Sequence, residues 1–125
     1  MSPEPADWLA RAEQALSSAR LLLATDPDGS ASRSYYAAFY PISAVFAAAG
    51  KSFRKHSALE AAVHRDLVRS GGWPPEFGKA YSRLAARRLT GDYGAELHVS
   101  SEEAAEAVDL AQRVVAEVNK RLQGS

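Results

Sequence analysis

The chain has 125 residues, of which 46% are hydrophobic, and its 15 Lys and Arg residues balance 15 Asp and Glu residues. This composition is typical of a globular domain with a modest core and is too apolar for intrinsic disorder. The absence of cysteine excludes disulfides, thiol chemistry and cysteine-ligated zinc. No apolar run reaches the roughly 20 residues of a membrane span, and the first residues do not resemble a signal peptide. We therefore expect one cytoplasmic domain over residues 1–125.

Charge is unevenly distributed along the chain. Residues 51–90 carry nine Lys and Arg against three Asp and Glu, whereas residues 91–118 carry seven acidic residues against one Arg. A basic block next to an acidic one is compatible with a phosphate-binding face. It is equally compatible with pairing between helices, within a bundle or across a dimer. The sequence favours the second interpretation, because opposite charges on facing helices are common.

Turn signals rich in Gly and Pro separate five helical segments. The 25 alanines favour helix throughout. The first segment, about 6–25, has apolar residues at helical spacing and Asp7 as its expected N-cap. The second, about 30–49, is apolar almost all round and is predicted to be the central helix.

The three later segments carry recognisable start signals. The third begins with the capping-box pattern Ser57–Glu60 and ends at Gly71, and the fourth runs from about Pro74 to about Leu89. The fifth opens with a second capping box, Ser100–Glu103. No segment alternates with a period of two, so we predict an all-α, up-and-down antiparallel bundle of four to five helices.

Common catalytic motifs are absent from the sequence. There is no phosphate-binding P-loop, no dinucleotide-binding glycine motif and no paired metal-ligand motif. The three histidines, His56, His64 and His98, lie in separate contexts. We therefore expect neither a metal site nor a cofactor.

Arginines and aromatic residues gather near the segment ends. Arg33 lies on an otherwise apolar helix, where an unpaired charge is costly, and Asp92 is a candidate partner for Arg33 or Arg88. One interpretation is a buried ion pair that anchors the loop after the fourth segment. The other is a polar pocket for phosphate or a nucleotide.

The stretch Ala31–Tyr40 resembles the second-helix signature of HEPN domains (higher eukaryotes and prokaryotes nucleotide-binding). The resemblance continues in order through Lys55–Ser57, Arg88–Tyr93 and Ser101–Ala104, and so covers nearly the whole chain. The chain is similar to the small stand-alone prokaryotic HEPN group, whose members often accompany a minimal nucleotidyltransferase. The resemblance implies a helical bundle that forms homodimers.

Many HEPN domains are metal-independent ribonucleases with an R-x(4–6)-H motif. Counted from Arg88, the histidine positions of that motif hold Tyr93, Gly94 and Ala95, and the next histidine is His98. The resemblance therefore implies a homodimeric interaction module related to nucleotides or nucleic acid. Such a module would be paired with a minimal nucleotidyltransferase in a toxin–antitoxin-like system, and enzyme activity is not the first expectation.

Two alternatives stay open. In one, the chain is a metal-independent ribonuclease toxin that cleaves single-stranded RNA, with Arg88 stabilising transition-state charge and His98 or His56 moving protons. In the other, the Tyr93 hydroxyl accepts a nucleotide from a partner enzyme. The candidate catalytic residues are Arg88, Asp92, Tyr93 and His98, and the candidate nucleotide- or RNA-binding residues are Arg33, Tyr36, Lys55, His56 and Arg87. The tyrosines and Phe39 around Arg33 are otherwise typical of a core or dimer interface.

Overall fold

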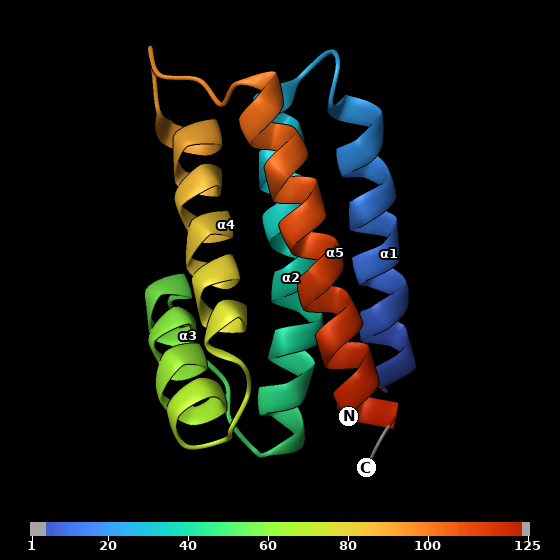
Figure 1. The fold of residues 1–125 in the computed structure, drawn as a ribbon, viewed down its shortest axis with the longest axis vertical. Helices are drawn as coiled ribbons and strands as arrows, with labels where there is room; N and C mark the ends of the chain where they lie inside the picture. Colours follow the sequence, from blue (N-terminus) through green and yellow to red (C-terminus); the bar gives the residue numbers. More distant parts are fainter. Residues whose placement is uncertain (1–4, 124–125) are drawn as a thin grey trace.

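The computed structural model describes residues 5–123, and in that range the chain forms helices and no strand. The elements are α1 (Pro5–Leu22), α2 (Pro27–Ala48), α3 (His56–Ala62), the π-helix η1 (Val63–Arg69), α4 (Pro75–Tyr93) and α5 (Ser101–Gln123). The four long helices run up and down (Figure 1), which confirms the predicted all-α bundle. None of the helices between residues 5 and 123 is long and apolar enough to cross a membrane.

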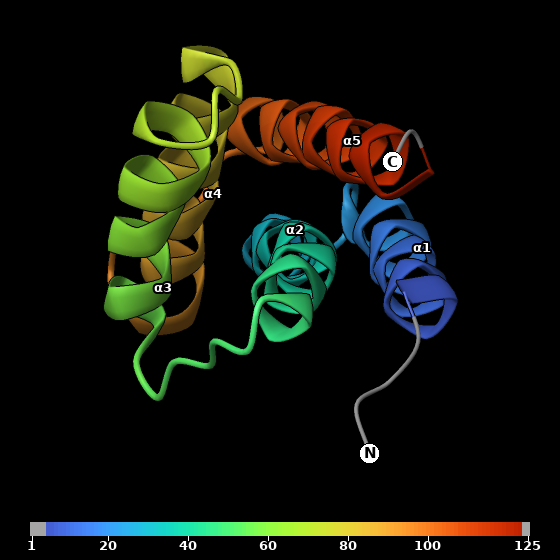
Figure 2. The same cartoon turned by 90° about the horizontal axis from the view of Figure 1, so that it is seen from below.

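Helix α2 lies at the centre of the bundle, as its apolar sequence predicts. Seen along the helices, α1, α5 and α4 cover three of its sides, while α3 lies beyond α4 (Figure 2). Its core positions are largely alanine, with Tyr35, Ile42 and Phe46 as the large buried side chains. No described helix covers the fourth side of α2, between α1 and α3. We call this side the open face.

Of the three N-terminal helix caps that the sequence predicts, one is confirmed and two are wrong. At α5, the Ser100 N–H donates to Glu103 Oε1 and the Glu103 N–H donates to Ser100 Oγ, both at 3.0 Å, which confirms that capping box. Asp7 is not an N-cap, because α1 begins at Pro5 and Asp7 lies inside the first turn. Ser57 does not cap α3 either: the helix begins one residue earlier, with Lys55 as N-cap.

Helix α4 extends four residues beyond its predicted end at Leu89. It continues through Gly91 to Tyr93, although glycine disfavours helix. A Cβ at Gly91 would lie 2.7 Å from the Asp28 carbonyl oxygen, so this glycine permits α4 to pack closely on the start of α2. The extra turn places Arg88 and Asp92 on one face of α4, at a spacing of four residues.

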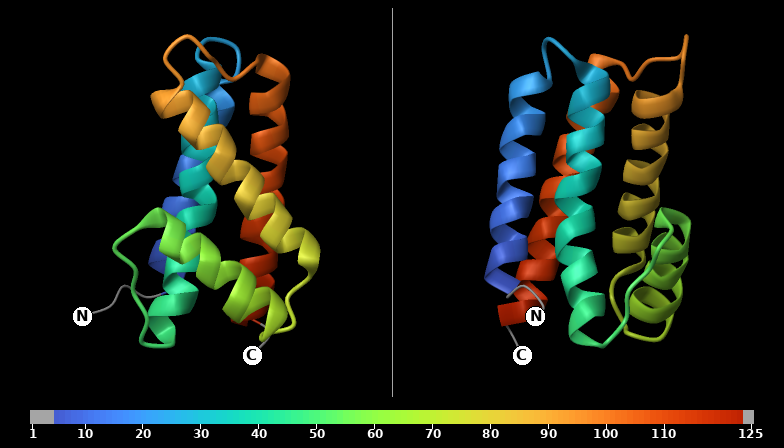
Figure 3. Two further views of the ribbon diagram at one scale, coloured as in Figure 1. Left: turned by 90° about the vertical axis from the view of Figure 1, so that its left-hand side faces the viewer. Right: turned by 180° about the vertical axis from the view of Figure 1, so that it is seen from behind.

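The third predicted segment is divided between α3 and the π-helix η1, which the sequence did not predict. The Ser70 N–H donates to the Arg65 carbonyl at 3.0 Å, a five-residue spacing that widens the turn. The whole segment crosses α4 at an angle (Figure 3). Two side-chain contacts join it to α4: Ser82 Oγ donates to Glu60 Oε2 at 2.6 Å and lies 2.7 Å from His64 Nε2.

Candidate functional site

Arg88 is the charged residue that α4 directs into the bundle, and it is only 8% exposed. Its guanidinium carbon lies 5.0 Å from the centre of the Tyr35 ring and 5.9 Å from the rings of Tyr36 and Tyr93. Its Nη1 lies 3.7 Å from Asp92 Oδ2. Asp92 is therefore the partner of Arg88, whereas Arg33 lies over the Tyr36 ring with its guanidinium carbon 5.9 Å from the ring centre.

His56, the first residue of α3, faces the same tyrosines. Its Nδ1 lies 2.6 Å from the Tyr35 hydroxyl, and its ring lies 4.9 Å from the Phe39 ring, centre to centre. Burial and the positive charge of Arg88 both lower the pKa of His56 below its ordinary value, so the ring is neutral at neutral pH. We call the group of Arg88, Asp92, Tyr35, Tyr36, His56 and Tyr93 the Arg88 cluster.

The cluster rests on a second buried tyrosine. The Tyr81 hydroxyl of α4 donates to the Tyr35 hydroxyl at 3.1 Å, and both rings are almost completely buried. Burial raises the pKa of both phenols, so each keeps its proton and stays neutral. The sequence predicts Tyr35 to lie in the core or an interface and indicates no polar role for Tyr81. One chemical rule could have indicated a polar role for Tyr81: a buried phenol hydroxyl usually finds a hydrogen-bond partner.

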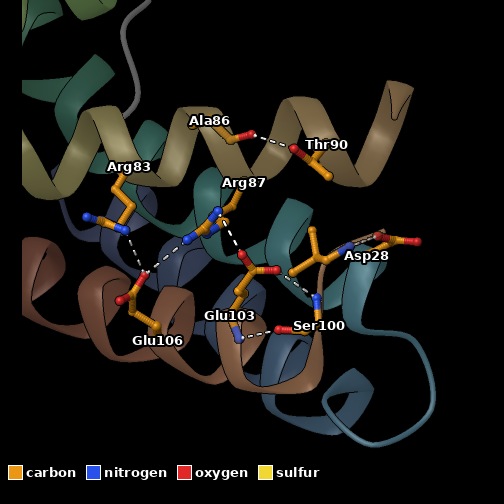
Figure 4. A network of polar contacts seen from close by, with 9 residues as sticks. Asp28, Arg83, Ala86, Arg87, Thr90, Ser100, Glu103 and Glu106 are labelled. Atoms are coloured by element: carbon orange, nitrogen blue, oxygen red, sulfur yellow. Dashed lines mark hydrogen bonds and ion pairs between the residues drawn. The ribbon is translucent and has the colours of Figure 1, made fainter. Parts of the chain in front are cut away.

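Arg87 lies on another side of α4 and joins it to α5. Its Nη1 lies 3.0 Å from Glu103 Oε2 and its Nη2 lies 3.8 Å from Glu106 Oε1, while Arg83 also approaches Glu106 at 3.6 Å (Figure 4). These pairs connect the basic block of the sequence to the acidic block inside the bundle. The contacts of Arg87 are thus with the last helix, not with the Arg88 cluster.

His98 lies in the connection between α4 and α5, and it contacts the start of α2. Its Nδ1 lies 2.6 Å from Asp28 Oδ2, and the Val99 N–H donates to Asp28 Oδ1 at 2.7 Å. The hydrogen bonds from His98 and Val99 lower the pKa of Asp28. The histidine of the Arg88 cluster is therefore His56 and not His98. Lys55, the N-cap of α3, is exposed next to it.

The residues that the structure describes contain no group of three or more His, Asp and Glu side chains placed to hold a metal ion. Apart from the Asp92 carboxylate, which accepts hydrogen bonds, the Arg88 cluster offers hydrogen-bond donors and aromatic faces. A guanidinium, an imidazole and an exposed phenol are suited to an anion that carries a planar group. A nucleotide, with a phosphate and a base, is such a ligand.

Comparison with known proteins agrees with the fold and with the sequence resemblance. The chain matches the HEPN domain family over residues 5–121. It is 47% identical over 88 residues to a UPF0332 protein of Thermotoga maritima, and the aligned residues cover 70% of this chain and 67% of that protein. It is 38% identical over 106 residues to a UPF0332 protein of Gloeobacter violaceus, covering 83% of this chain and 84% of that protein.

Among solved structures, the crystal structure of TT1696 from Thermus thermophilus has the same fold. The TM-score is 0.76 at 24% identity, and the match covers 93% of this chain and 96% of that one. The helical bundle, the sequence signature and the family match over residues 5–121 agree, and the chain belongs to the HEPN domain family.

Proposed function

We propose that this protein is a binding module for nucleotides or single-stranded nucleic acid, that it acts as a homodimer, and that it works with a minimal nucleotidyltransferase in a two-component system. The observation that carries the proposal is the position of Arg88. A nearly buried guanidinium lies against tyrosine rings, beside a neutral histidine and an exposed tyrosine.

The electrostatics of Arg88 support anion binding. Asp92 approaches it at 3.7 Å, a longer separation than the ~2.8 Å of a well-made charged hydrogen bond. The guanidinium has five N–H donors, so it retains donors for a further acceptor. A phosphate oxygen is a good acceptor for such a group because guanidinium binds phosphate in a two-pronged geometry.

The aromatic residues around Arg88 support recognition of a base. Tyr93 is 71% exposed at the end of α4, and its ring lies near the Arg88 guanidinium. Tyr36 is partly exposed on α2, between Arg33 and Arg88. Bases stack on aromatic side chains with little dependence on sequence. A phosphate on Arg88 with a base on Tyr93 or Tyr36 is the arrangement that we propose.

The open face of α2 supports the homodimer. Tyr36 and Tyr40 are partly exposed there, with ring centres 5.8 Å apart. Trp8 and Arg11 of α1 extend the face: the Trp8 ring lies 6.0 Å from the Tyr40 ring, and the Arg11 guanidinium lies 5.4 Å from it. Tyrosine, tryptophan and arginine are the residues enriched in protein interfaces. A second copy on this face would also bring two Arg88 clusters toward each other.

The nucleotidyltransferase partner gives the exposed Tyr93 a second role. Its exposed phenol oxygen could attack the α-phosphorus of a nucleoside triphosphate. A tyrosyl O–P bond would form, the bond to the β-phosphate would break, pyrophosphate would leave and the phenol proton would pass to a base of the partner. The partner would supply the catalytic groups and this chain the acceptor. Mass spectrometry of Tyr93 in protein co-expressed with the nucleotidyltransferase of its host tests this role, and an unmodified Tyr93 would contradict it.

A metal-independent ribonuclease is the alternative function, and the proximity of His56 to Arg88 favours it. A neutral imidazole and a guanidinium at one site can move a proton and stabilise phosphorane charge. The test is cleavage of single-stranded RNA in the presence of a chelator. Cleavage that is lost in Arg88→Ala and His56→Ala would favour the alternative, whereas intact RNA would favour the binding module.

The proposed binding function is tested by titrating the protein with adenosine monophosphate and with a short single-stranded RNA, followed by calorimetry. Arg88→Ala removes the central cation and is expected to weaken binding at least tenfold, since a charged hydrogen bond contributes about 1.5–3 kcal/mol. Arg87→Ala is the matched control, because that residue is adjacent in sequence and contacts α5. Equal binding by the wild type, Arg88→Ala and Arg87→Ala would contradict the proposal.

A further inference from the structure

His56 is held from one side by two buried tyrosines in series. The Tyr81 hydroxyl donates to the Tyr35 hydroxyl oxygen at 3.1 Å, and the Tyr35 hydroxyl lies 2.6 Å from His56 Nδ1. Tyr35 is 1% exposed and Tyr81 is 0% exposed. Because neither ring has access to bulk water, the protons of both hydroxyls must be satisfied within this series.

The positions of the protons follow from the donors available. Each phenol carries one proton, and a neutral imidazole carries one N–H on either Nδ1 or Nε2. The Tyr35 oxygen already accepts the proton of Tyr81, so the proton of Tyr35 is directed to His56 Nδ1. We propose that Tyr81 and Tyr35 fix neutral His56 as its Nε2–H tautomer, and that His56 thereby serves the Arg88 cluster as a hydrogen-bond donor to phosphate and not as a base.

The tautomer decides which chemistry is open to the ring. A general base needs a free lone pair on a nitrogen that can reach the substrate proton. In the Nε2–H tautomer the lone pair lies on Nδ1, and Tyr35 occupies it. Nε2–H can donate to a phosphate oxygen together with Arg88. The inference rests on the proposed phosphate-binding function, and it argues against His56 as the base of a ribonuclease.

The surroundings of His56 keep its ring neutral. Tyr35, Tyr36 and Phe39 face it from α2, and the positive charge of Arg88 acts on it from α4. In its own helix, Glu60 follows one turn later and accepts a hydrogen bond from Ser82. Burial and Arg88 lower the pKa of His56. Protonation would also place an N–H on Nδ1 against the proton of Tyr35, so the tyrosines oppose it as well.

Long-range proton–nitrogen NMR on the full chain, labelled with nitrogen-15 in histidine, reads the tautomer directly. At a pH well above the ordinary histidine pKa of about 6.5, we expect His56 to show a protonated Nε2 and an unprotonated Nδ1. An Nδ1–H tautomer would overturn the proposal, because the hydrogen bonds would then run in the opposite direction, from His56 through Tyr35 to Tyr81.

The Tyr35→Phe variant tests whether the Tyr35 hydroxyl sets the tautomer of His56. Without the Tyr35 proton, we expect the Nε2–H population of His56 to fall and its pKa to rise. Tyr40→Phe is the matched control: it removes a hydroxyl from the same helix while keeping the ring that packs on Trp8, and it should change neither quantity. If Tyr35→Phe does not fold, the wild-type tautomer decides the proposal, because an Nδ1–H ring overturns it without any variant. In a folded Tyr35→Phe protein, an unchanged tautomer and an unchanged His56 pKa would overturn the proposal.

Adenosine monophosphate separates failure of this inference from failure of the proposed function. We expect binding to shift the His56 Nε2–H signal, and Tyr35→Phe to weaken binding roughly three- to tenfold, the effect of one neutral hydrogen bond. An Nε2–H tautomer in a protein that binds no nucleotide would overturn the donor role together with the proposed function. An Nδ1–H tautomer with retained binding would overturn the tautomer assignment alone.

Discussion

The guanidinium carbon of Arg88 lies 5.0 Å from the centre of the Tyr35 ring, and this contact organises the candidate site. Through its hydroxyl, Tyr35 also reaches His56, so one buried ring connects the charge on α4 to the histidine on α3. The site therefore combines residues from three helices that are far apart in the sequence. Its chemistry depends on how α3 packs beside α2 and α4.

Removing Arg88 should change the proton affinity of His56. The positive charge of Arg88 disfavours a second positive charge nearby and is one of two causes that lower the pKa of His56, after burial. We expect Arg88→Gln to raise the pKa of His56 toward its ordinary value, and the same change at Arg87 to leave it unaltered. Proton NMR titration of the histidine ring measures both. A pKa unaffected by Arg88→Gln would show that burial alone accounts for the shift.

The same lowered pKa predicts how stability changes with pH. The folded state binds a proton at His56 less readily than the unfolded state, so the contribution to stability is complete above pH ~6.5. It is lost as pH falls from there through the lowered pKa of the folded state. His56→Gln should flatten this part of the stability curve. Urea unfolding at a series of pH values is the measurement, and an equally steep curve in the variant would contradict the assignment.

Asp28 should stabilise the connection between α4 and α5 more than His98 does. Its carboxylate accepts both the Val99 N–H and the His98 side chain, so Asp28→Ala leaves a partly buried N–H unpaired, at a cost of about 1–3 kcal/mol. His98→Ala keeps that bond and removes only the contact of a mostly exposed imidazole, worth about 1 kcal/mol or less. Urea unfolding compares the two, and equal losses would count against this account.

The pH dependence of Asp28 falls in a separate, more acidic range. Its pKa is lowered in the folded state, mainly by the hydrogen bonds from His98 and Val99. Its contribution is therefore present above the unfolded pKa of about 3.9 and is lost as pH falls through the lower folded value. Asp28→Asn should reduce the acid sensitivity of folding below about pH 4.

The two serines of the predicted capping boxes provide a matched pair. Ser100 Oγ accepts the Glu103 N–H, so Ser100→Ala should cost about 1 kcal/mol. Ser57 is exposed and lies within the first turn of α3, which has no side-chain cap bond. Ser57→Ala should therefore change stability by about 0.5 kcal/mol or less. A loss at Ser57 as large as that at Ser100 would show that α3 is capped in a way that the structure lacks.

A charged side chain introduced on the open face of α2 should dissociate the proposed dimer. Tyr40→Glu places a carboxylate among Tyr36, Trp8 and the expected second copy, where it would be desolvated. We expect light scattering after gel filtration to change from the mass of a dimer to that of a monomer. Leu97→Glu is the control, because Leu97 is 73% exposed in the connection between α4 and α5. A wild-type protein that is already monomeric would contradict the dimer.

The sequence was sufficient for the bundle and its central helix. Alanine content, helical spacing and glycine-rich turns identified five segments near the observed ones. The capping box at Ser100 was correct because Ser100 is exposed at a helix end, where local hydrogen bonds decide. Ser57 has the same pattern, but α3 starts at His56 instead, where the ring contacts Tyr35. There, tertiary packing outweighs the local signal.

The candidate site was only partly predictable. The sequence left Asp92 as a partner for either Arg33 or Arg88, and the structure pairs it with Arg88, because their spacing suits one helix turn once α4 continues through Gly91. Sequence spacing could not decide whether His56 or His98 lies beside Arg88, because the answer depends on which helix end each loop reaches. The structure pairs His98 with Asp28 and places His56 against Tyr35. No local pattern indicated either contact, because each joins residues far apart in the chain.

Nuclear magnetic resonance mapping of bound adenosine monophosphate is the decisive test of the proposed binding site, because it locates the ligand as well as detecting it. We expect the largest shifts to fall on Arg88, His56 and Tyr93, and we expect the shifts to vanish in Arg88→Ala but to persist in Arg87→Ala. Shifts concentrated elsewhere, for example in the 270 Å³ groove between α4 and α5 that Phe77 and Leu110 line, would contradict it. So would the absence of any shift at a saturating nucleotide concentration.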